Sequence, residues 1–237
     1  MADNNPFQLA VTMILSLDPT VVEITVRSLM VSGAAVLLSA LFALPIGTLL
    51  AIGRFPGRRA LDFIATTMIA FPAVLVGLIG SQMLGHNGPL SFLGWLFTVQ
   101  GMILAQAVLV MPLLIAFTRG AVGAEWERAG EGLLSLGFNR ITAIWPMLIE
   151  SRFALVTVML AGFGRAIAEV GTANMIGGNL LGDTRVLTTA IMQETQRGDF
   201  ALANALGLVL LAVAIGVNLV GRVIVNALTL EKADQHS

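Results

Sequence analysis

The sequence predicts an all-α integral membrane protein with about five transmembrane helices. Hydrophobic residues make up 57% of the 237 residues and charged residues only 11%, whereas soluble domains carry about 25% charge. Residues 63–118 contain no Asp, Glu, Lys or Arg, and such a run is long enough for two crossings of a bilayer. The chain therefore has too little polar surface to cover a soluble globule.

The composition also excludes several classes of function. A net charge of −1 provides no basic field for nucleic acid. Cysteine is absent and the two histidines, His86 and His236, lie far apart, so we expect no metal site. Lys232, the single lysine, follows no glycine-rich stretch, so the ATP-binding loop of ATPases is not expected here. We expect no catalytic residue and no cofactor on this chain, and the acidic residues 1–5 do not suggest a cleavable signal peptide.

The first predicted span covers residues 28–52, which carry no charge and lie between Arg27 and Arg54. Its length is sufficient to cross about 30 Å of hydrocarbon as a helix. Pro45 lies inside this span, and a membrane helix tolerates such a kink where neighbouring groups satisfy the freed carbonyl.

The second and third predicted spans cover residues 61–84 and 98–118. The sequence His-Asn-Gly-Pro at 86–89 separates them, because Gly-Pro and the residue before a proline oppose helix. Between the two spans we expect a short interfacial segment with Trp95 at the level of the lipid headgroups.

The fourth and fifth predicted spans cover residues 153–172 and 200–221. Residues 7–17 are apolar but only about two-thirds as long as a span. We therefore expect an amphipathic interfacial helix there, with a short sixth span as the alternative.

Positive charge predicts the orientation of the chain. Nine Lys and Arg residues fall in the 52–60 loop, the 119–152 loop and the tail, and three on the other side. Cytoplasmic loops are the ones enriched in Lys and Arg. The N-terminus is thus expected outside and the C-terminus in the cytoplasm. The predicted organisation is an extracytoplasmic or interfacial segment 1–24, a transmembrane domain 25–228 and a cytoplasmic tail 229–237.

The 119–152 loop is longer than a connector between two spans requires. Trp126, Ala129, Leu133 and Leu136 recur at helical spacing and predict one apolar face. Gly137 is suited to a helix C-cap, and a second short helix is expected over residues 139–149. This pattern favours a docking surface for a partner over a solvated connector.

The segment Glu131-Gly-Leu-Leu-Ser-Leu-Gly137 resembles the E-A-A-x-x-x-G loop of ABC importer permeases. In that family the loop forms the coupling helix, which lies in a cleft of a cytoplasmic ATPase. Gly132 and Leu133 replace the two alanines of the motif, and Pro146 comes about four residues early, close to one helical turn. The resemblance implies an ATPase-coupling site formed by Glu127, Glu131, Gly132, Leu133, Leu136 and Gly137.

The second half of the chain resembles the permeases of tungstate and molybdate importers, and the tungstate type most closely. The resemblance rests on GFGRAIAEVGTANMIGGN (162–179), TRVLTTAI (184–191) and PAVLVGL (72–78), and it covers about residues 20–228. It implies a type I importer bundle that works by alternating access in the cytoplasmic (inner) membrane of a prokaryote. It also implies a homodimer, a separate ABC ATPase that holds ATP and Mg, and an extracytoplasmic oxyanion-binding protein.

Arg165 and Glu169 are the two charges inside the fourth predicted span. They are four residues apart, so they share a helix face and can pair. We favour a structural ion pair, because a neutralised arginine is a weak anion trap. The alternative is that Arg165 lines the anion route while Glu169 prevents tight binding of the dianion. Gly164, Ala168 and Gly171 are expected to form a small-residue stripe beside the pair.

Residues 173–199 form a polar segment that we expect on the outer side. Glycine-rich turns precede a short helix over about residues 184–198 that is a candidate for re-entering the membrane. Two interpretations are equally supported: hydroxyl and guanidinium donors to an oxyanion, or a docking surface for the binding protein. The donors would be Thr184, Arg185, Thr188 and Thr189. The predicted pathway or gate residues are Pro72, Arg165, Glu169, Gly171 and Thr188.

Two rival functions follow from the membrane composition alone. A secondary transporter or channel for a small anion would move its substrate without ATP and usually carries an inverted repeat, which the sequence does not reveal. A membrane enzyme needs a catalytic constellation, for which a chain without Cys or Tyr offers little.

Overall fold

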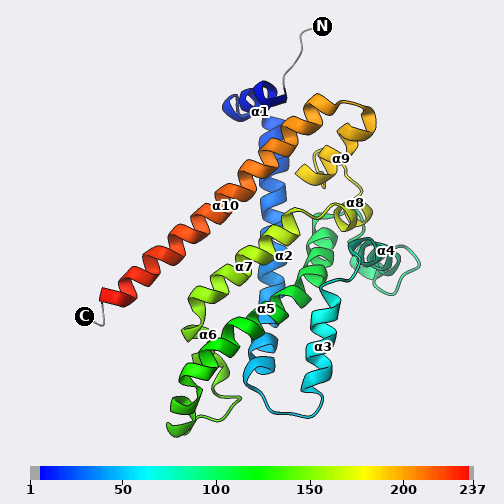
Figure 1. Ribbon diagram of the computed structural model, residues 1–237. Helices are drawn as coiled ribbons and strands as arrows, with labels where there is room; N and C mark the ends of the chain where they lie inside the picture. Colours follow the sequence, from blue (N-terminus) through cyan, green and yellow to red (C-terminus); the bar gives the residue numbers. More distant parts are fainter. Residues whose placement is uncertain (1–5, 235–237) are drawn as a thin grey trace. The chain divides into compact units, whose positions relative to one another are not determined.

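The computed structural model describes residues 6–234, with side chains for residues 8, 11, 12 and 14–225. Residues 1–5, His236 and the Lys232 side chain lie outside the described part. Every regular element in residues 6–234 is helical, as predicted (Figure 1). In chain order the elements are α1 (Pro6–Leu15), α2 (Pro19–Ile52), α3 (Arg58–Met68), α4 (Ala73–Leu84), the 3₁₀ turn η1 (Ser91–Leu93), α5 (Val99–Ser135), α6 (Ile144–Glu150), α7 (Arg152–Ile167), α8 (Gly171–Gly177), α9 (Leu187–Arg197) and α10 (Phe200–Asp234).

Within the described residues, three helices are long and apolar enough to cross a membrane: α2, α5 and the first part of α10. Two broken pairs, α3 with α4 and α6 with α7, raise the number of candidate spans to five if each pair counts as one. This agrees with the predicted number. The helix α1 has 10 residues and is about 15 Å long, so it is too short for the alternative of a sixth span.

The helix α2 starts nine residues before the predicted span, because Asp18 caps its first turn and Pro19 is its first residue. The Asp18 Oδ1 atom accepts hydrogen bonds from the Thr20 N–H at 2.9 Å and the Val21 N–H at 3.2 Å. Asp at the N-cap followed by Pro at the first helical position is a strong helix start. As a result, Arg27 lies within the helix and not before it.

The predicted second span is interrupted at Pro72, which corrects the expectation of one helix over 61–84. The helix α3 ends at Met68 and α4 begins at Ala73. Pro72 has extended backbone angles, and its carbonyl accepts from the Leu75 and Val76 N–H groups. The residue before a proline is driven out of the helical region. Pro45 and Pro112, in contrast, lie inside the unbroken helices α2 and α5.

The predicted fourth span is also too long, because α7 ends at Ile167 and α8 starts only at Gly171. The Glu169 N–H bonds the Ala166 carbonyl at 3.1 Å, which tightens the last turn of α7. The Glu169 side chain then accepts the Thr172 N–H. Glu169 thus starts a new helix where the pattern predicted continuation.

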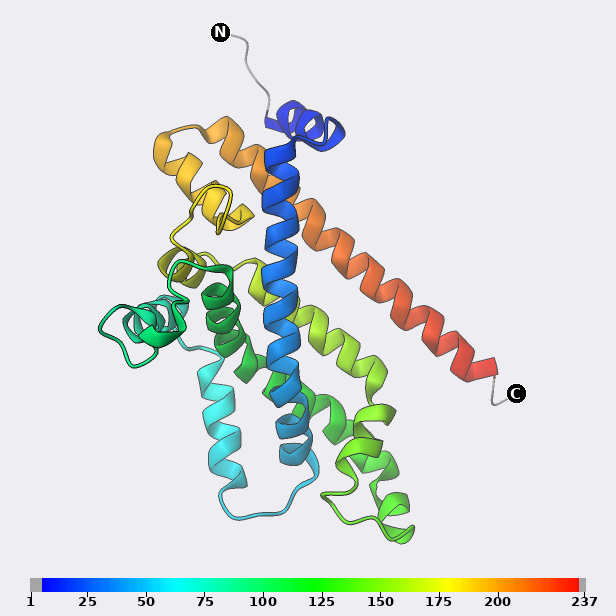
Figure 2. The ribbon, with the colours of Figure 1, turned by 180° about the vertical axis from the view of Figure 1, so that it is seen from behind.

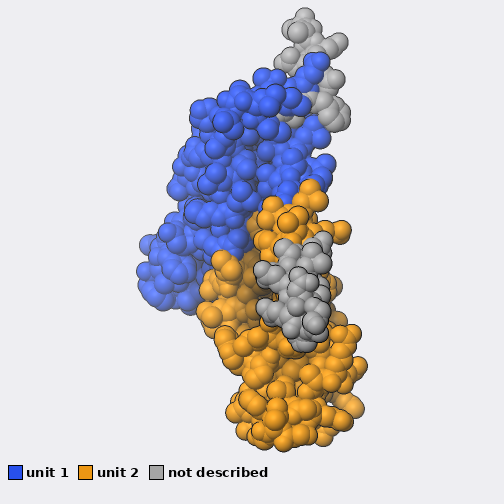
Figure 3. All heavy atoms as spheres, turned by 90° about the vertical axis from the view of Figure 1, so that its left-hand side faces the viewer, with its two compact units in different colours: residues 1–35, 72–106, 164–217 blue, residues 36–71, 107–163, 218–237 orange. Residues whose placement is uncertain are grey.

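The chain divides into two compact units, shown in different colours in Figure 3. The first comprises residues 1–35, 72–106 and 164–217, and the second residues 36–71, 107–163 and 218–237. In the first unit, α2, α9 and α10 share one apolar cluster, which consists of Val21, Ile24, Leu187, Ala190, Leu206 and Val209. In the second unit the buried cluster consists of Ile52, Val122, Ala143, Met147 and Leu155.

Candidate functional site

The helix α5 continues beyond the predicted third span into the candidate coupling loop and ends at Ser135. Its end is a Schellman motif: the Phe138 N–H bonds the Leu133 carbonyl and the Gly137 N–H bonds the Leu134 carbonyl, both at 3.1 Å. Gly137 has a φ of 89°, a left-handed conformation that glycine adopts without steric cost. The predicted C-cap is therefore confirmed.

A side-chain cap at Asn139 then turns the chain toward α6. Asn139 Oδ1 accepts from the Ile141 and Thr142 N–H groups at 2.9 Å, and the Asn139 N–H bonds Thr142 Oγ1 at 2.9 Å. The second helix predicted over 139–149 is thus a capped turn followed by α6. A bend of 80° separates α6 from α7 at Ser151.

The residues predicted to form a single apolar face of the 119–152 loop differ in burial. Trp126 and Leu133 pack against the buried cluster of the second unit, whereas Leu136 is 77% exposed, because the chain reverses at Gly137. Glu127, Glu131, Gly132 and Gly137 are exposed as well. We define the coupling patch as the exposed apolar residues Leu134, Leu136, Phe138, Ile141, Trp145 and Ile149.

Two arginines attach the coupling loop to the end of α2, a role that the sequence analysis missed. Arg58 Nε donates to the Leu50 carbonyl at 2.7 Å, and Arg140 Nη1 donates to the Ile52 carbonyl. The Arg140 guanidinium also lies 5.4 Å from the centre of the Trp126 ring. Cations are favourable at helix C-termini, where carbonyls lack partners. Burial, and then the charges of Arg54 and Arg58, lower the pKa of Arg140.

A cavity of about 610 Å³ lies beside this attachment in the second unit. Its charged and aromatic lining residues are Arg58, Arg59, Asp62, Arg119, Trp126 and Glu127. Arg119 forms an ion pair with Asp62. The lining is therefore of mixed charge, and among the predicted coupling residues Glu127 faces this cavity.

The predicted Arg165–Glu169 pair forms, with 2.7 Å between Nη1 and Oε2, although Glu169 lies beyond the end of α7. The second carboxylate oxygen of Glu169 accepts the Thr172 N–H at 3.1 Å. Thr188 Oγ1, in α9, donates to the Glu169 carbonyl at 2.9 Å. Three of the predicted pathway residues, Arg165, Glu169 and Thr188, are thus brought together in the first unit.

The predicted stripe of small residues does not form. Ala168 falls in the break after α7, and Gly171 is the first residue of α8. Close helix packing occurs instead between α4 and α8, which lie side by side in Figures 1 and 2. A Cβ atom on Gly77 of α4 would lie 3.2 Å from Thr172 Cα. Pro72 is the N-cap of α4 and Gly171 is the first residue of α8, so both residues lie at the starts of the two helices that pack closely.

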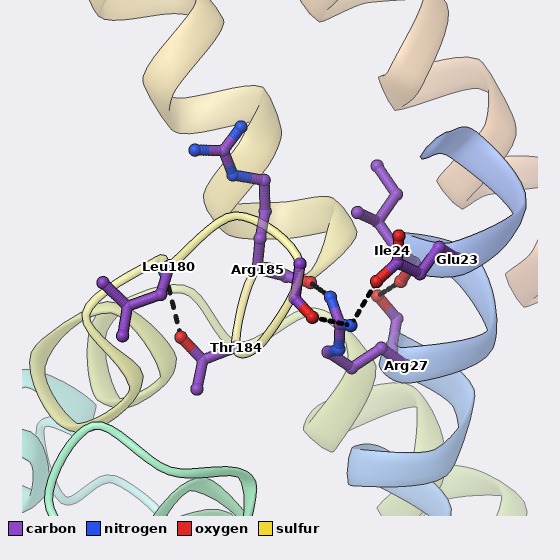
Figure 4. A network of polar contacts seen from close by, with 8 residues as sticks. Glu23, Ile24, Arg27, Leu180, Thr184 and Arg185 are labelled. Carbon is purple, nitrogen blue, oxygen red and sulfur yellow. Dashed lines mark hydrogen bonds and ion pairs between the residues drawn. The ribbon is translucent and has the colours of Figure 1, made fainter. Parts of the chain in front are cut away.

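The loop between α8 and α9 is attached to α2 by the polar network in Figure 4. Arg27 Nη2 pairs with Glu23 at 2.6 Å and donates to the Gly182 carbonyl at 2.9 Å, while Nη1 donates to the Arg185 carbonyl at 3.2 Å. The Leu187 N–H donates to Ser28 Oγ at 2.8 Å. The sequence analysis had treated Arg27 only as the boundary of a span.

The threonines proposed as oxyanion donors already donate to backbone carbonyls. Thr184 Oγ1 donates to the Gly177 carbonyl, and Thr189 Oγ1 donates to the Val186 carbonyl at 3.1 Å. Thr188 donates to Glu169 as described above. A hydroxyl has one proton to donate, so these three threonines have none left for an oxyanion. Arg185, the fourth predicted donor, donates through Nη2 to the Asn179 carbonyl at 3.4 Å, while its buried Nε has no hydrogen-bond partner among the described residues. Leu181, in the same loop, is 68% exposed, so the donor and docking interpretations of this segment both stay predictions.

Comparison with known proteins assigns this architecture to a family. The chain is 36% identical to the tungstate uptake system permease TupB of Peptoclostridium acidaminophilum over 217 residues, which are 90% of this chain and 94% of that protein. The chain belongs to the ABC transporter permeases. The permease is also 38% identical to a probable anion ABC transporter permease of Haloferax volcanii, over 84% of this chain and 88% of that one. No model of a protein family matches it.

A solved structure supports the fold of the permease. A chain of the MetNI methionine ABC transporter, in an inward-facing conformation, aligns with a TM-score of 0.72 at 17% identity, over 90% of the permease and 97% of that chain. This likeness confirms the predicted all-α importer-permease fold. The identity with the tungstate permeases confirms the predicted family and the multi-pass location in the cytoplasmic membrane. The permease is the membrane component of the transporter, and hydrolysis of ATP belongs to a separate subunit.

Replacement of Arg140 by Ala is expected to destabilise the cytoplasmic end of the permease. The change removes the bond to the Ile52 carbonyl and the contact with Trp126, which together contribute about 1–3 kcal/mol. The thermal midpoint of the detergent-solubilised permease should fall. Arg128→Ala is the matched control, because the Arg128 side chain is 76% exposed and pairs only with Glu125 among described residues. Equal midpoints for the two variants would contradict the attachment.

Replacement of Gly77 by Val is expected to separate α4 from α8. The new side chain would meet Met175 Sδ at 2.9 Å and the backbone of Thr172. Overpacking of this kind costs about 1–3 kcal/mol, which lowers the thermal midpoint of the permease by about 3–10 °C. Gly33→Val is the control, since a Cβ atom at Gly33 meets nothing within 4 Å. A stable Gly77→Val variant would refute the close approach.

Proposed function

We propose that the permease imports tungstate, or the closely similar molybdate, by alternating access driven by its ATPase. The observation that carries this proposal is the 36% identity with the tungstate permease over nearly the whole of both chains. The relative from Haloferax volcanii, described as a permease for an anion, supports the same class of substrate. The proposed substrate is therefore a tetrahedral oxyanion of charge −2.

The coupling patch is the proposed contact with the ATPase. Its apolar side chains lie around the Gly137 reversal and contribute little to the core of the second unit, which leaves them available to a cleft on a partner. Glu127, Glu131 and Gly132 lie on the last turns of α5 before this reversal. Leu133 is half-buried and packs against the buried cluster of the second unit. ATP and Mg are held by the partner in this proposal.

The segment around Arg165, Glu169, Gly171 and Thr188 is the proposed gate region, with Pro72 at the neighbouring end of α4. Breaks in membrane helices occur where backbone is buried in protein or lines a cavity, and the α7–α8 break contains Glu169, the ion-pair partner of Arg165. We further propose that two copies of the permease form a homodimer with the route between them. An extracytoplasmic binding protein would deliver the oxyanion to the side that carries the α8–α9 loop.

The decisive experiment uses proteoliposomes that contain the permease with its ATPase. Binding protein loaded with tungstate, molybdate or sulfate is added, and both ATP hydrolysis and uptake of the oxyanion are measured. The proposal requires uptake that depends on ATP and on tungstate-loaded or molybdate-loaded binding protein. Equal flux through the permease alone, without ATP, would instead identify an ATP-independent transporter or channel.

A further inference from the structure

The two members of the Arg165–Glu169 pair are buried to different extents. The Glu169 side chain is 5% exposed and the Arg165 side chain 34% exposed. Both carboxylate oxygens of Glu169 are engaged, one by Arg165 and one by the Thr172 N–H. Within the described residues, the guanidinium of Arg165 has a hydrogen bond only to Glu169, through Nη1. Arg165 therefore keeps N–H groups for a second acceptor, whereas Glu169 has none of its oxygens free.

The position of Arg165 within α7 favours protein or water over lipid as its surroundings. Arg165 lies about 20 Å along α7 from Arg152, and a span crosses about 30 Å of hydrocarbon. A partly exposed guanidinium inside a span faces a water-filled cavity or another protein surface. Ala168, one turn beyond the half-buried Arg165, is exposed. The surface around Arg165 is thus expected to line an aqueous route.

We propose that Arg165 binds the oxyanion inside the transport route. The Glu169 carboxylate acts as an intramolecular competitor, which occupies the Arg165 guanidinium until the passing dianion displaces it. This inference deepens the proposed function and rests on it. A carboxylate and a tetrahedral oxyanion accept the same charge-assisted hydrogen bonds from a guanidinium. Competition by Glu169 keeps the binding weak, as a conduction site requires so that the ion can leave.

The position of Glu169 also links the anion to the hinge between α7 and α8. The carboxylate that pairs with Arg165 holds the first turn of α8 through the Thr172 N–H. Its displacement loosens that turn, while the bond from Thr188 keeps the Glu169 backbone attached to α9. The oxyanion is thereby coupled to the start of α8, which packs against α4.

The first test measures retention of tungstate by the permease–ATPase complex in nanodiscs, without binding protein, by equilibrium dialysis. Glu169→Gln preserves an oxygen for the Thr172 N–H but removes the competing charge. We expect it to retain tungstate at least about tenfold more tightly than wild type, given the strength of a charge interaction at this distance. The double variant Glu169→Gln with Arg165→Gln should retain none. Equal retention by all three proteins would overturn the proposal.

A charge exchange separates this role from a purely structural ion pair. The variant that combines Arg165→Glu with Glu169→Arg restores a pair of opposite charges. It should recover part of the thermal midpoint lost in Arg165→Gln, because the ion pair is restored while the Thr172 N–H loses its acceptor. It should not recover tungstate uptake, because a carboxylate would then face the route. Recovery of uptake would show that the pair is only structural.

A third measurement does not depend on altering the pair. The chain contains no cysteine, so Ala168→Cys introduces a single thiol beside Arg165. A water-soluble, anionic thiol reagent should modify it, and tungstate should slow the reaction. Leu211→Cys, at a 55% exposed apolar position of α10, is the control expected to stay unmodified in a bilayer. If Ala168→Cys is as inert as the control, the aqueous route at Arg165 does not exist.

The outcomes also distinguish this inference from the proposed function. Uptake by the wild-type complex with loaded binding protein tests the function alone. If that uptake occurs but Glu169→Gln retains no additional tungstate, the inference about Arg165 fails and the function stands.

Discussion

Replacement of Leu136 by Asp is expected to weaken assembly of the permease with its ATPase strongly. Leu136 is 77% exposed, so the change leaves the core of the second unit intact and the permease should fold normally. In the proposed contact between the coupling patch and the ATPase, the carboxylate would be buried among apolar side chains. A disruptive substitution at the centre of such an interface typically costs about 2–4 kcal/mol of binding free energy, which weakens binding about 30-fold to 1,000-fold. Copurification of the ATPase with tagged permease measures the effect.

The control for this prediction is Leu136→Met, which preserves apolar volume and should assemble like wild type. Trp145→Asp, at another exposed position of the coupling patch, should reproduce the loss. Normal recovery of the ATPase with both Asp variants would mean that the coupling patch is not the docking surface. An unfolded permease is recognised by its size-exclusion profile before the ATPase is added.

Replacement of Gly137 by Val is expected to uncouple ATP hydrolysis from transport. Gly137 has a φ of 89°, and a side chain in the left-handed region costs about 1–2 kcal/mol, more for a β-branched residue. The variant relieves this strain by leaving the Schellman motif, which moves the Asn139 turn and the Arg140 attachment. Uptake should fall at least tenfold, which corresponds to about 1.4 kcal/mol, and loaded binding protein should no longer stimulate hydrolysis.

Gly198→Val is the matched control for Gly137→Val. Gly198 ends α9 with a φ of 79°, and a Cβ atom there meets nothing within 4 Å, so the backbone strain is similar but lies outside the coupling loop. Both variants should lose thermal stability to a similar degree, while only Gly137→Val loses coupling. Unchanged uptake and stimulation in Gly137→Val would show that the coupling assignment is wrong.

The sequence alone determined the features that depend on composition and on local chain geometry. A scarcity of charge over residues 63–118 is sufficient to require a membrane, because no soluble surface can be built from such a chain. Gly137 was predicted as a helix end from its position after an apolar run, and the Schellman motif forms there because glycine alone enters the left-handed region without strain. The motif residues around Glu131 and Gly137, and the 162–179 stretch, were sufficient to recognise the family.

The tertiary structure decided how helices are interrupted and which partner each polar group finds. Pro45, Pro72 and Pro112 all lie in apolar runs, yet Pro45 and Pro112 stay inside unbroken helices while Pro72 lies in a break and becomes the N-cap of α4. A spacing of four residues predicted that Arg165 and Glu169 would meet, but the unequal burial of the two side chains arises from α8 and α9, which bind Glu169 through Thr172 and Thr188. Likewise, Arg27 and Arg140 donate to backbone carbonyls that are distant in sequence, since long-range contacts are set by packing and not by local pattern.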